Sequence, residues 1–351
     1  MNASTAQKYK YQNLKDYLIG KIRAGGFDGS GRLDSEPQLS ERFSLSRNTI
    51  RQAIQELENE GYVYRIHGKG TFVRTATPAN SRKIALMLYD TAYMAHPVTG
   101  GLIRGIDETL SRNGYILDIL ASKRSFHDEN LTRLAESYAG FLIGTYQLDE
   151  LMLAELEKIS LPHLFVKNYP INHDVHAARI NFTHAGFLAA EHLIRTGCGN
   201  LSLIYPGDKI AISAEFREGV YSAALEYGAR LRRENIFTAD FSDRLAVPEI
   251  CAELLRHEDR PDGVICASDE LAITLLAELK RHEISVPGDI SVIGCNNTEN
   301  STLATPPLTT VDIPVMELGR RSADLLLRMI HGEAAESELL EPSLVIRGST
   351  R

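Results

Sequence analysis

Several absences exclude whole classes of protein. No apolar run in the 351 residues approaches the 18 or more that a membrane-spanning helix requires, and the longer runs, such as residues 84–89, are short. Residues 1–12 contain neither an apolar run nor a small-residue cleavage site, so no signal peptide is expected. These features predict a cytoplasmic protein without a membrane partner.

Cysteine and histidine are present, but not at metal-ligand spacing. The four cysteines are 53, 15 and 29 residues apart and include no Cys-x-x-Cys pair: Cys198, Cys251, Cys266 and Cys295. Two of them, Cys266 and Cys295, lie in apolar strand-like runs, which is typical of buried thiols. Four histidines are close in sequence but fall on separate predicted elements: His163, His173, His176 and His184. We therefore expect a reduced protein with no metal ion.

Catalytic signatures are also missing. The sequence contains no Gly-x-Ser-x-Gly motif, no Walker loop and no Rossmann fingerprint. The carboxylates of Asp269 and Asp289 lie near predicted strand ends, but neither has a partner nearby in sequence to suggest an acid–base pair. The sequence predicts a protein that is not an enzyme and that uses no cofactor.

Charge is unevenly distributed along the chain. The net charge is −8, yet residues 1–74 hold 12 basic and 8 acidic side chains, which gives them +4 and leaves −12 on the remainder. A length of 351 residues allows about two or three domains. A basic N-terminal segment on an acidic body indicates that only the first part of the chain meets phosphate.

Three short helices are predicted in the basic segment, at residues 11–22, 37–43 and 47–57. In the third, Ser46 is suited to cap the N-terminus, and one face is apolar: Ile50, Ala53, Ile54 and Leu57. The opposite face and its flanks are polar: Arg47, Asn48, Thr49, Arg51, Gln52 and Gln55. Arg, Asn and Gln make paired contacts with base edges, so this face is typical of a recognition helix in a major groove. A solvated amphipathic helix is the alternative.

A hairpin follows and favours the DNA-binding interpretation. Residues 62–66 and 71–74 read as strands around the tight turn His67-Gly68-Lys69-Gly70. The glycines let the backbone approach a groove, and Lys69 can reach a phosphate. No helix follows the Gly-x-Gly pair, which argues against a nucleotide-binding loop.

These motifs, in this order, resemble the GntR-type winged helix-turn-helix over about residues 9–74. The resemblance is carried by three stretches: Leu33-Asp34-Ser35-Glu36, Ser46-Arg47-x-Thr49-x-Arg51 and residues 67–73. It implies DNA contacts from a set of six residues: Ser46, Arg47, Thr49, Arg51, His67 and Gly68. Pro37 departs from the pattern, because many members carry a basic residue there, and base preference near this position is therefore open.

The rest of the chain is predicted to be an α/β body of doubly wound parallel sheets. Residues 75–82 are small, polar and Pro-containing, which is typical of a flexible linker. Beyond them, buried-strand runs alternate with amphipathic helices: residues 84–89, 115–120, 141–144, 163–166, 201–205, 263–267 and 290–294. About 270 residues exceed what one such sheet needs, so residues 83–351 should form two lobes with ligands at the strand carboxyl ends.

This body resembles the effector domain of LacI-type repressors, which is similar to periplasmic sugar-binding proteins. The matching stretches are residues 101–106, 189–194, 216–219, 267–272, 286–294, 305–311 and 318–321. The resemblance implies that the chain crosses between the lobes near residues 181, 312 and 332. A GntR-type head on a LacI-type body resembles the arabinose-repressor type of regulator.

The same resemblance implies an effector site made by these residues: Thr91, Tyr93, His96, Lys167, Asn168, Asn181, Arg217, Ser268, Asp269 and Asn296. Asn181 and Asn296 stand where Asp is usual, and Lys167-Asn168 stands where Asp-Arg is usual. These differences make the site less anionic, which is the basis of a hypothesis that the effector is acidic, such as a sugar acid. A neutral sugar is the alternative, because Asn serves hydroxyl groups equally well.

We therefore predict an allosteric transcriptional repressor of carbohydrate-use genes, relieved by a small sugar or sugar acid. Its partners would be operator DNA, the effector and a second copy of the chain. A periplasmic-type sugar-binding protein is the alternative, but it would need a signal peptide and no winged helix. A sugar-processing enzyme would need a catalytic pair.

Overall fold

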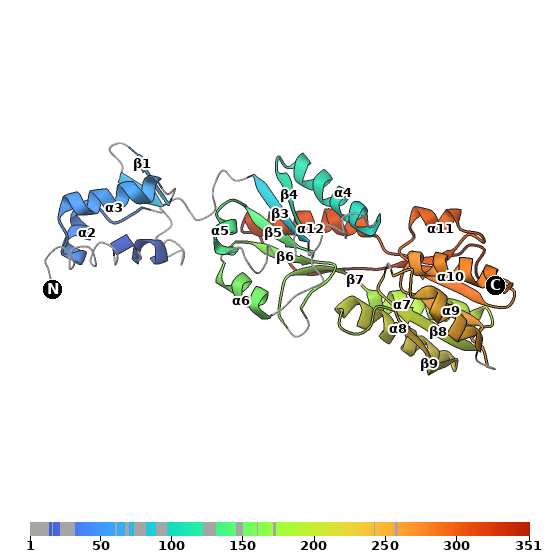
Figure 1. Cartoon of the computed structure of the whole chain (residues 1–351). Helices are drawn as coiled ribbons and strands as arrows, with labels where there is room; N and C mark the ends of the chain where they lie inside the picture. Colours follow the sequence, from blue (N-terminus) through green and yellow to red (C-terminus); the bar gives the residue numbers. More distant parts are fainter. Residues whose placement is uncertain are drawn as a thin grey trace. The chain divides into compact units, whose positions relative to one another are not determined.

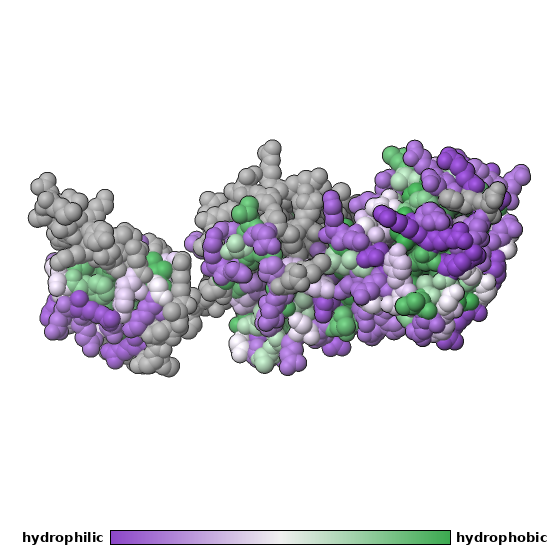
Figure 2. Space-filling model, turned by 90° about the horizontal axis from the view of Figure 1, so that it is seen from below, coloured by the Kyte–Doolittle hydropathy of each residue, from purple (hydrophilic) through white to green (hydrophobic). Residues whose placement is uncertain are grey.

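The computed structural model describes most of the chain. The described residues are 14–15, 17–21, 32–59, 62–66, 70–73, 82–88, 97–121, 131–144, 150–159, 161–170, 173–241, 243–256 and 259–351. They divide into two compact units: Met1–Ile84, Phe126–Gly140 and Leu151–Pro162 in the first, and Ala85–Ser125, Phe141–Glu150 and His163–Arg351 in the second. Within these ranges, every helix is too short or too polar to span a bilayer. Hydrophilic residues predominate on the face seen in Figure 2, and apolar ones form separate patches.

The N-terminal part of the first unit is a small helical module. Residues 14–15 and 17–21 are helical, followed by α2 (Glu36–Phe43) and α3 (Arg47–Asn59). The Ser35 backbone N–H donates to Gln38 Oε1 (2.8 Å) at the start of α2, and Ser44 ends it in the left-handed conformation (φ 50°). The predicted apolar face of α3 is confirmed as core, because all four of its residues are at most 1% exposed. They pack with Leu14, Leu18, Leu33, Leu39, Leu45 and Val63.

A short antiparallel hairpin completes this module. β1 (Val63–Ile66) pairs with β2 (Gly70–Val73) in a register that sets Ile66 opposite Gly70. The Tyr64 and Phe72 rings stack at 5.8 Å, and Arg32 forms an isolated bridge to Phe72. The turn residues His67, Gly68 and Lys69 lie outside the described residues, as do residues 75–81 of the predicted linker.

Two mostly parallel six-stranded sheets form the rest of the fold, as the α/β prediction required (Figure 1). The first has the order β13-β7-β6-β5-β3-β4: Glu338–Leu340, Ala177–Ile180, His163–Val166, Gly140–Ile143, Lys83–Leu88 and Ile116–Ala121. The second has the order β14-β12-β11-β10-β8-β9: Ser343–Val345, Thr309–Asp312, Ser291–Cys295, Gly263–Cys266, Asn200–Tyr205 and Arg230–Thr238. Only the edge strand β14 is antiparallel among the pairings described for the second sheet. The two-sheet, doubly wound fold class is confirmed.

Helices separate the strands and pack on the sheets. Their bounds are α4 Pro97–Arg112, α5 Leu131–Ala135, α6 Glu150–Lys158, α7 Phe182–Arg195, α8 Ala211–Tyr227, α9 Val247–Arg256, α10 Asp269–Arg281, α11 Glu299–Leu303 and α12 Val315–Ile330. α4 and α12 pack together, and α12 contacts β6 and β7; we call these two helices and the first sheet the first lobe. α7 to α11 belong with the second sheet, the second lobe.

Glycine sets how closely α7 and α8 approach. A Cβ on Gly186 would lie 1.9 Å from the Phe216 carbonyl oxygen, and one on Gly219 would lie 1.8 Å from the Thr183 carbonyl oxygen. Any side chain at these two positions would push the helices apart.

The chain passes between the lobes three times. β7 leads into α7 at Asn181, and β12 leads into α12 at residues 313–314. The third passage, expected near residue 332, lies instead at residues 341–342. The reason is that β13 still pairs with β7 of the first sheet, whereas β14 pairs with β12 of the second.

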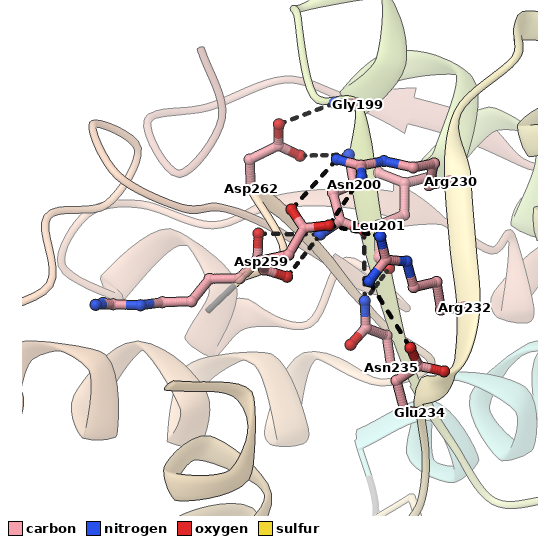
Figure 3. A network of polar contacts seen from close by, with 10 residues as sticks. Gly199, Asn200, Leu201, Arg230, Arg232, Glu234, Asn235, Asp259 and Asp262 are labelled. Atoms are coloured by element: carbon pink, nitrogen blue, oxygen red, sulfur yellow. Dashed lines mark hydrogen bonds and ion pairs between the residues drawn. The ribbon is translucent and has the colours of Figure 1, made fainter. Parts of the chain in front are cut away.

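A polar network fixes the amino ends of β8 and β10 against the edge strand β9 (Figure 3). The Asp262 carboxylate accepts hydrogen bonds from the backbone N–H groups of Gly199 and Asn200, each 2.9 Å long. Asp259 lies between Arg230 and Arg232 at 2.8 and 2.6 Å. The first set satisfies backbone groups, whereas the second consists of half-exposed ion pairs.

Asp262→Ala should therefore lower the free energy of unfolding by about 2 kcal/mol, because it leaves two backbone donors without their charged acceptor. Asp259→Ala is the matched control and should cost less than about 1 kcal/mol, since exposed ion pairs contribute little. Urea unfolding monitored by circular dichroism compares the two. An equal or larger loss in Asp259→Ala would contradict this ranking.

Candidate functional site

The first candidate surface is the exposed face of α3. The Ser46 hydroxyl accepts from the Thr49 backbone N–H (3.2 Å) and lies 2.8 Å from the Thr49 hydroxyl, which confirms Ser46 as the cap of this helix. Arg47, Asn48, Arg51 and Gln52 are all exposed, opposite the apolar face. The structure thus presents the predicted set of base-reading side chains together near the start of one helix.

Arg51 is held by an acidic residue that the sequence analysis assigned no role. Its guanidinium donates to both carboxylate oxygens of Glu36, at 3.0 and 3.3 Å. This hydrogen bond raises the pKa of Arg51, which stays charged. Glu36 opens α2, so the ion pair joins the two helices and orients the Arg51 fork. The sequence shows Glu36 as an acidic residue at the start of the second helix, but nothing local in it indicates that Glu36 pairs with Arg51.

The hairpin belongs to the same small module as α3 and is the second part of the predicted DNA-binding surface. His67, Gly68 and Lys69 lie outside the described residues, but β1 and β2 bracket them as a three-residue connection. Arg32 lies beside the hairpin, because a Cβ at Gly70 would be 3.0 Å from Arg32 Nε. This arginine was not among the predicted contact residues, since only the fold brings it to the hairpin.

The second candidate site lies at the carboxyl ends of the parallel strands. Thr91, Tyr93 and His96 lie outside the described residues. Four short segments of the predicted site each follow a strand end: Lys167-Asn168 after β6, Asn181 after β7, Ser268-Asp269 after β10 and Asn296 after β11. Because the strands of each sheet run parallel, the first two segments lie at the carboxyl edge of the first sheet and the last two at that of the second, and α/β sheets bind ligands at such edges.

Lys167 follows β6 of the first lobe, and its side chain lies close to residues of the second lobe. Its backbone is left-handed (φ 69°), and its ammonium lies 6.0 Å from the centre of the Phe182 ring of α7. Burial raises the pKa of the Cys295 thiol, and the positive charge of Lys167 partly opposes that rise. Cys295 ends β11 directly before Asn296, so the structure brings Lys167 and Asn296 to one region.

Asp269 is enclosed by the protein. It is 0% exposed, and its oxygens accept from the Thr298 backbone (2.6 Å), the Thr298 hydroxyl (3.0 Å) and the Thr310 hydroxyl (2.6 Å). Burial raises the pKa of Asp269 to about 6, although these hydrogen bonds oppose the rise. The carboxylate ties the segment after β10 to the segment after β11 and to β12, with Ser268 capping α10 beside it.

Asn181 and Arg217 also have partners within the protein. Asn181 caps α7 by accepting from the His184 backbone N–H (3.0 Å), and its amide donates to Glu341 (3.0 Å). Arg217 donates to Asp208 Oδ1 at 2.8 Å from the first half of α8. Glu341 and Asp208 were missed because the chain brings them there from the third passage and from the β8–α8 loop.

A further polar chain was missed at the second passage between the lobes. Arg347 donates to Asn297 Oδ1 (2.6 Å), and the Asn297 amide donates to Asp312 Oδ1 (3.0 Å). Asn297 is left-handed (φ 52°) and directly follows the predicted site residue Asn296. Among the described residues, no three His, Cys, Asp or Glu side chains are grouped as metal ligands.

Comparisons with known families match both parts of the chain. Residues 10–73 match the model of bacterial regulatory proteins of the gntR family, and residues 190–350 match that of a periplasmic binding protein-like domain. The chain is 28% identical to the arabinose metabolism transcriptional repressor of Geobacillus stearothermophilus, over 97% of this chain and 98% of that one. It is 26% identical to the transcriptional repressor CytR of Escherichia coli, over 87% and 88%.

Solved structures share the fold. The transcriptional regulator CelR in complex with cellobiose has a TM-score of 0.71 at 23% identity and covers 96% of this chain and 98% of its own. A LacI family transcriptional regulator from Enterococcus faecium with bound ribose has a TM-score of 0.67 at 28% identity, covering 76% and 98%.

The buried Asp269 predicts a pH dependence of stability. Its folded pKa of about 6 exceeds the usual 3.8, so its contribution is fully present below about pH 4 and is lost as pH rises through about 6. Between pH 4 and pH 7.5, the wild type should lose about 2 kcal/mol relative to Asp269→Asn, which has no proton to release there. Urea unfolding of both proteins across this range measures the difference. Parallel curves would contradict the assignment.

Proposed function

We propose that this chain, a transcriptional regulator with a GntR-family DNA-binding domain and a periplasmic binding protein-like domain, represses carbohydrate-use genes until a small sugar-like effector binds. The relatives that cover nearly the whole chain are repressors rather than enzymes. The proposal covers the class of effector, the operator DNA and the residues that contact each of them.

The observation that carries the proposal is the exposed face of α3. Four exposed side chains lie on the face of α3 opposite its core face: Arg47, Asn48, Arg51 and Gln52. They can contact DNA without any change to the packing of the core. Arg to guanine and Asn or Gln to adenine are the pairings that this set allows in a major groove. Ser46 and Thr49 at the helix start, with His67, Gly68 and Lys69 in the hairpin turn, would contact the phosphate backbone.

The proposed effector class follows from the relatives and from the strand-end residues. One relative is named for arabinose metabolism, and two structural neighbours hold cellobiose and ribose. Asn168, Asn181, Arg217, Ser268, Asp269 and Asn296 supply amide, hydroxyl and charged groups of the kind that bind sugar hydroxyls. Asn181, Arg217, Ser268 and Asp269 have hydrogen-bond partners within the protein, so they would exchange a partner or position a neighbour.

A sugar acid remains our preferred effector over a neutral sugar. The Lys167 charge reaches the second lobe at Cys295, and the amides Asn168 and Asn296 add no negative charge. An effector carboxylate would offset the Lys167 charge. Neutral pentoses, including arabinose, are the matched comparison.

We further propose a cytoplasmic homodimer. One winged helix reads a short half-site, and two copies are needed for operator-length recognition. Leu245 and Leu303 of the second lobe are 89% and 75% exposed, which leaves apolar surface for a second copy to cover. The effector would bias the lobes toward one arrangement and thereby change the affinity of the paired heads for DNA.

A gel-shift experiment tests the proposal. The full chain should bind DNA taken from upstream of its neighbouring genes, and a sugar or sugar acid should release it. Glucuronate and galacturonate should act at lower concentration than arabinose or ribose if the effector is acidic; release by neutral sugars alone would reverse that choice. Failure to bind any DNA at low salt, with sugar binding intact, would favour the alternative of a sugar-binding protein without a regulatory role.

Arg47→Ala and Arg51→Ala should each weaken specific DNA binding by about 1–3 kcal/mol, because each removes a base-reading fork. Effector affinity, measured by calorimetry, should not change. Arg42→Ala is the matched control, since Arg42 lies in α2 with its guanidinium over the Tyr17 ring, 4.7 Å from the ring centre. A loss of effector affinity in the α3 variants would contradict the assignment of DNA binding to the N-terminal module and effector binding to the two lobes.

A further inference from the structure

Tyr169, Arg179 and Glu215 form a cluster that has no role in the site described above. The Tyr169 hydroxyl donates a short hydrogen bond to Glu215 Oε1. The Arg179 guanidinium lies 4.4 Å from the centre of the Tyr169 ring and 4.0 Å from Glu215 Oε1. Each member therefore contacts the other two.

The cluster joins the two lobes. Tyr169 follows β6 and Arg179 lies in β7, so both belong to the first sheet. Glu215 lies in α8, which packs on α7, β8 and β9 of the second lobe. The covalent chain links the lobes at its three passages, and this cluster adds a non-covalent link beside the first of them, since Arg179 lies two residues before Asn181.

Its surroundings strengthen the contact. Burial raises the pKa of Glu215, and burial together with the Glu215 carboxylate raises the pKa of Tyr169. All three side chains are half-buried, and a hydrogen bond to a charged group is worth more where water is partly excluded.

We propose that the Tyr169–Arg179–Glu215 cluster is a latch that holds the two lobes together and sets how tightly the effector binds. This rests on the proposed function in one respect, namely that the effector binds to residues of both lobes. Groups on opposite lobes meet only when the lobes are close, so the latch and such an effector favour the same arrangement. Residues of the latch are positioning residues, because they act through the lobes.

The chain contains a matched control cluster of the same three residue types. The Tyr227 hydroxyl donates to Glu191 (2.7 Å) and accepts from Arg195 (3.1 Å). Its members lie on α7 and α8 and join two helices of one lobe. Tyr169→Phe and Tyr227→Phe thus each remove one tyrosine hydroxyl, but only the first loosens a contact between lobes.

A distance measurement tests the latch without any effector. Spin labels on Ser111→Cys of α4 and Glu253→Cys of α9 report the separation of the lobes in the full chain, and the four native cysteines are buried away from the label. Tyr169→Phe and Glu215→Gln should each broaden the electron–electron distance distribution and add a longer component. Tyr227→Phe should leave it unchanged. Unchanged distributions in both latch variants, or an equal change in Tyr227→Phe, would overturn the proposal.

The second measurement concerns the effector. Tyr169→Phe should raise the concentration of sugar that half-releases the operator by about fivefold, whereas Tyr227→Phe should not change it. If no sugar releases the wild type, the proposed function fails while the distance measurement still decides the latch. If the wild type responds and Tyr169→Phe responds equally, the latch is wrong and the proposed function stands.

Discussion

The parallel direction of the strands is the constraint on which the body of this protein depends. Parallel strands of one sheet end at the same edge, so β6 and β7 bring polar residues to the carboxyl edge of the first sheet, and β10 and β11 bring them to that of the second. The chain also makes its first two passages between the lobes directly from such ends, after β7 and β12. Site and hinge therefore share residues: Asn181 caps a helix of the second lobe, and Asn297 next to Asn296 bonds to Asp312.

A buried carboxylate holds this edge together. Asp269 accepts hydrogen bonds from Thr298, which starts α11 after β11, and from Thr310 of β12. Its burial costs stability when it is ionised, and the hydrogen bonds only partly offset that cost. A folded protein accepts such a cost where it fixes the geometry of a binding edge.

The sequence predicted local features well and long-range contacts poorly. The α3 faces and the hairpin followed from periodicity and turn residues, and the buried strands from apolar runs. β7, β9, β12, β13 and β14 were not predicted, because β9 is interrupted by charged residues and the other four strands are only three or four residues long. The third passage was consequently misplaced near residue 332 rather than at 341–342. The partners of site residues were missed for another reason: Glu36, Asp208 and Glu341 reach Arg51, Arg217 and Asn181 only through the fold.

The central claim is that a sugar-type effector binds at the strand carboxyl ends of a protein whose head binds DNA. Hydrogen–deuterium exchange of the full chain, with and without the sugar or sugar acid that releases it from DNA, tests this most directly. The account predicts slower exchange in the segments that follow β6, β10 and β11, around residues 167–169, 267–270 and 296–298. Slower exchange confined to the amino ends of the strands, around residues 199–200 and 259–262, would contradict it.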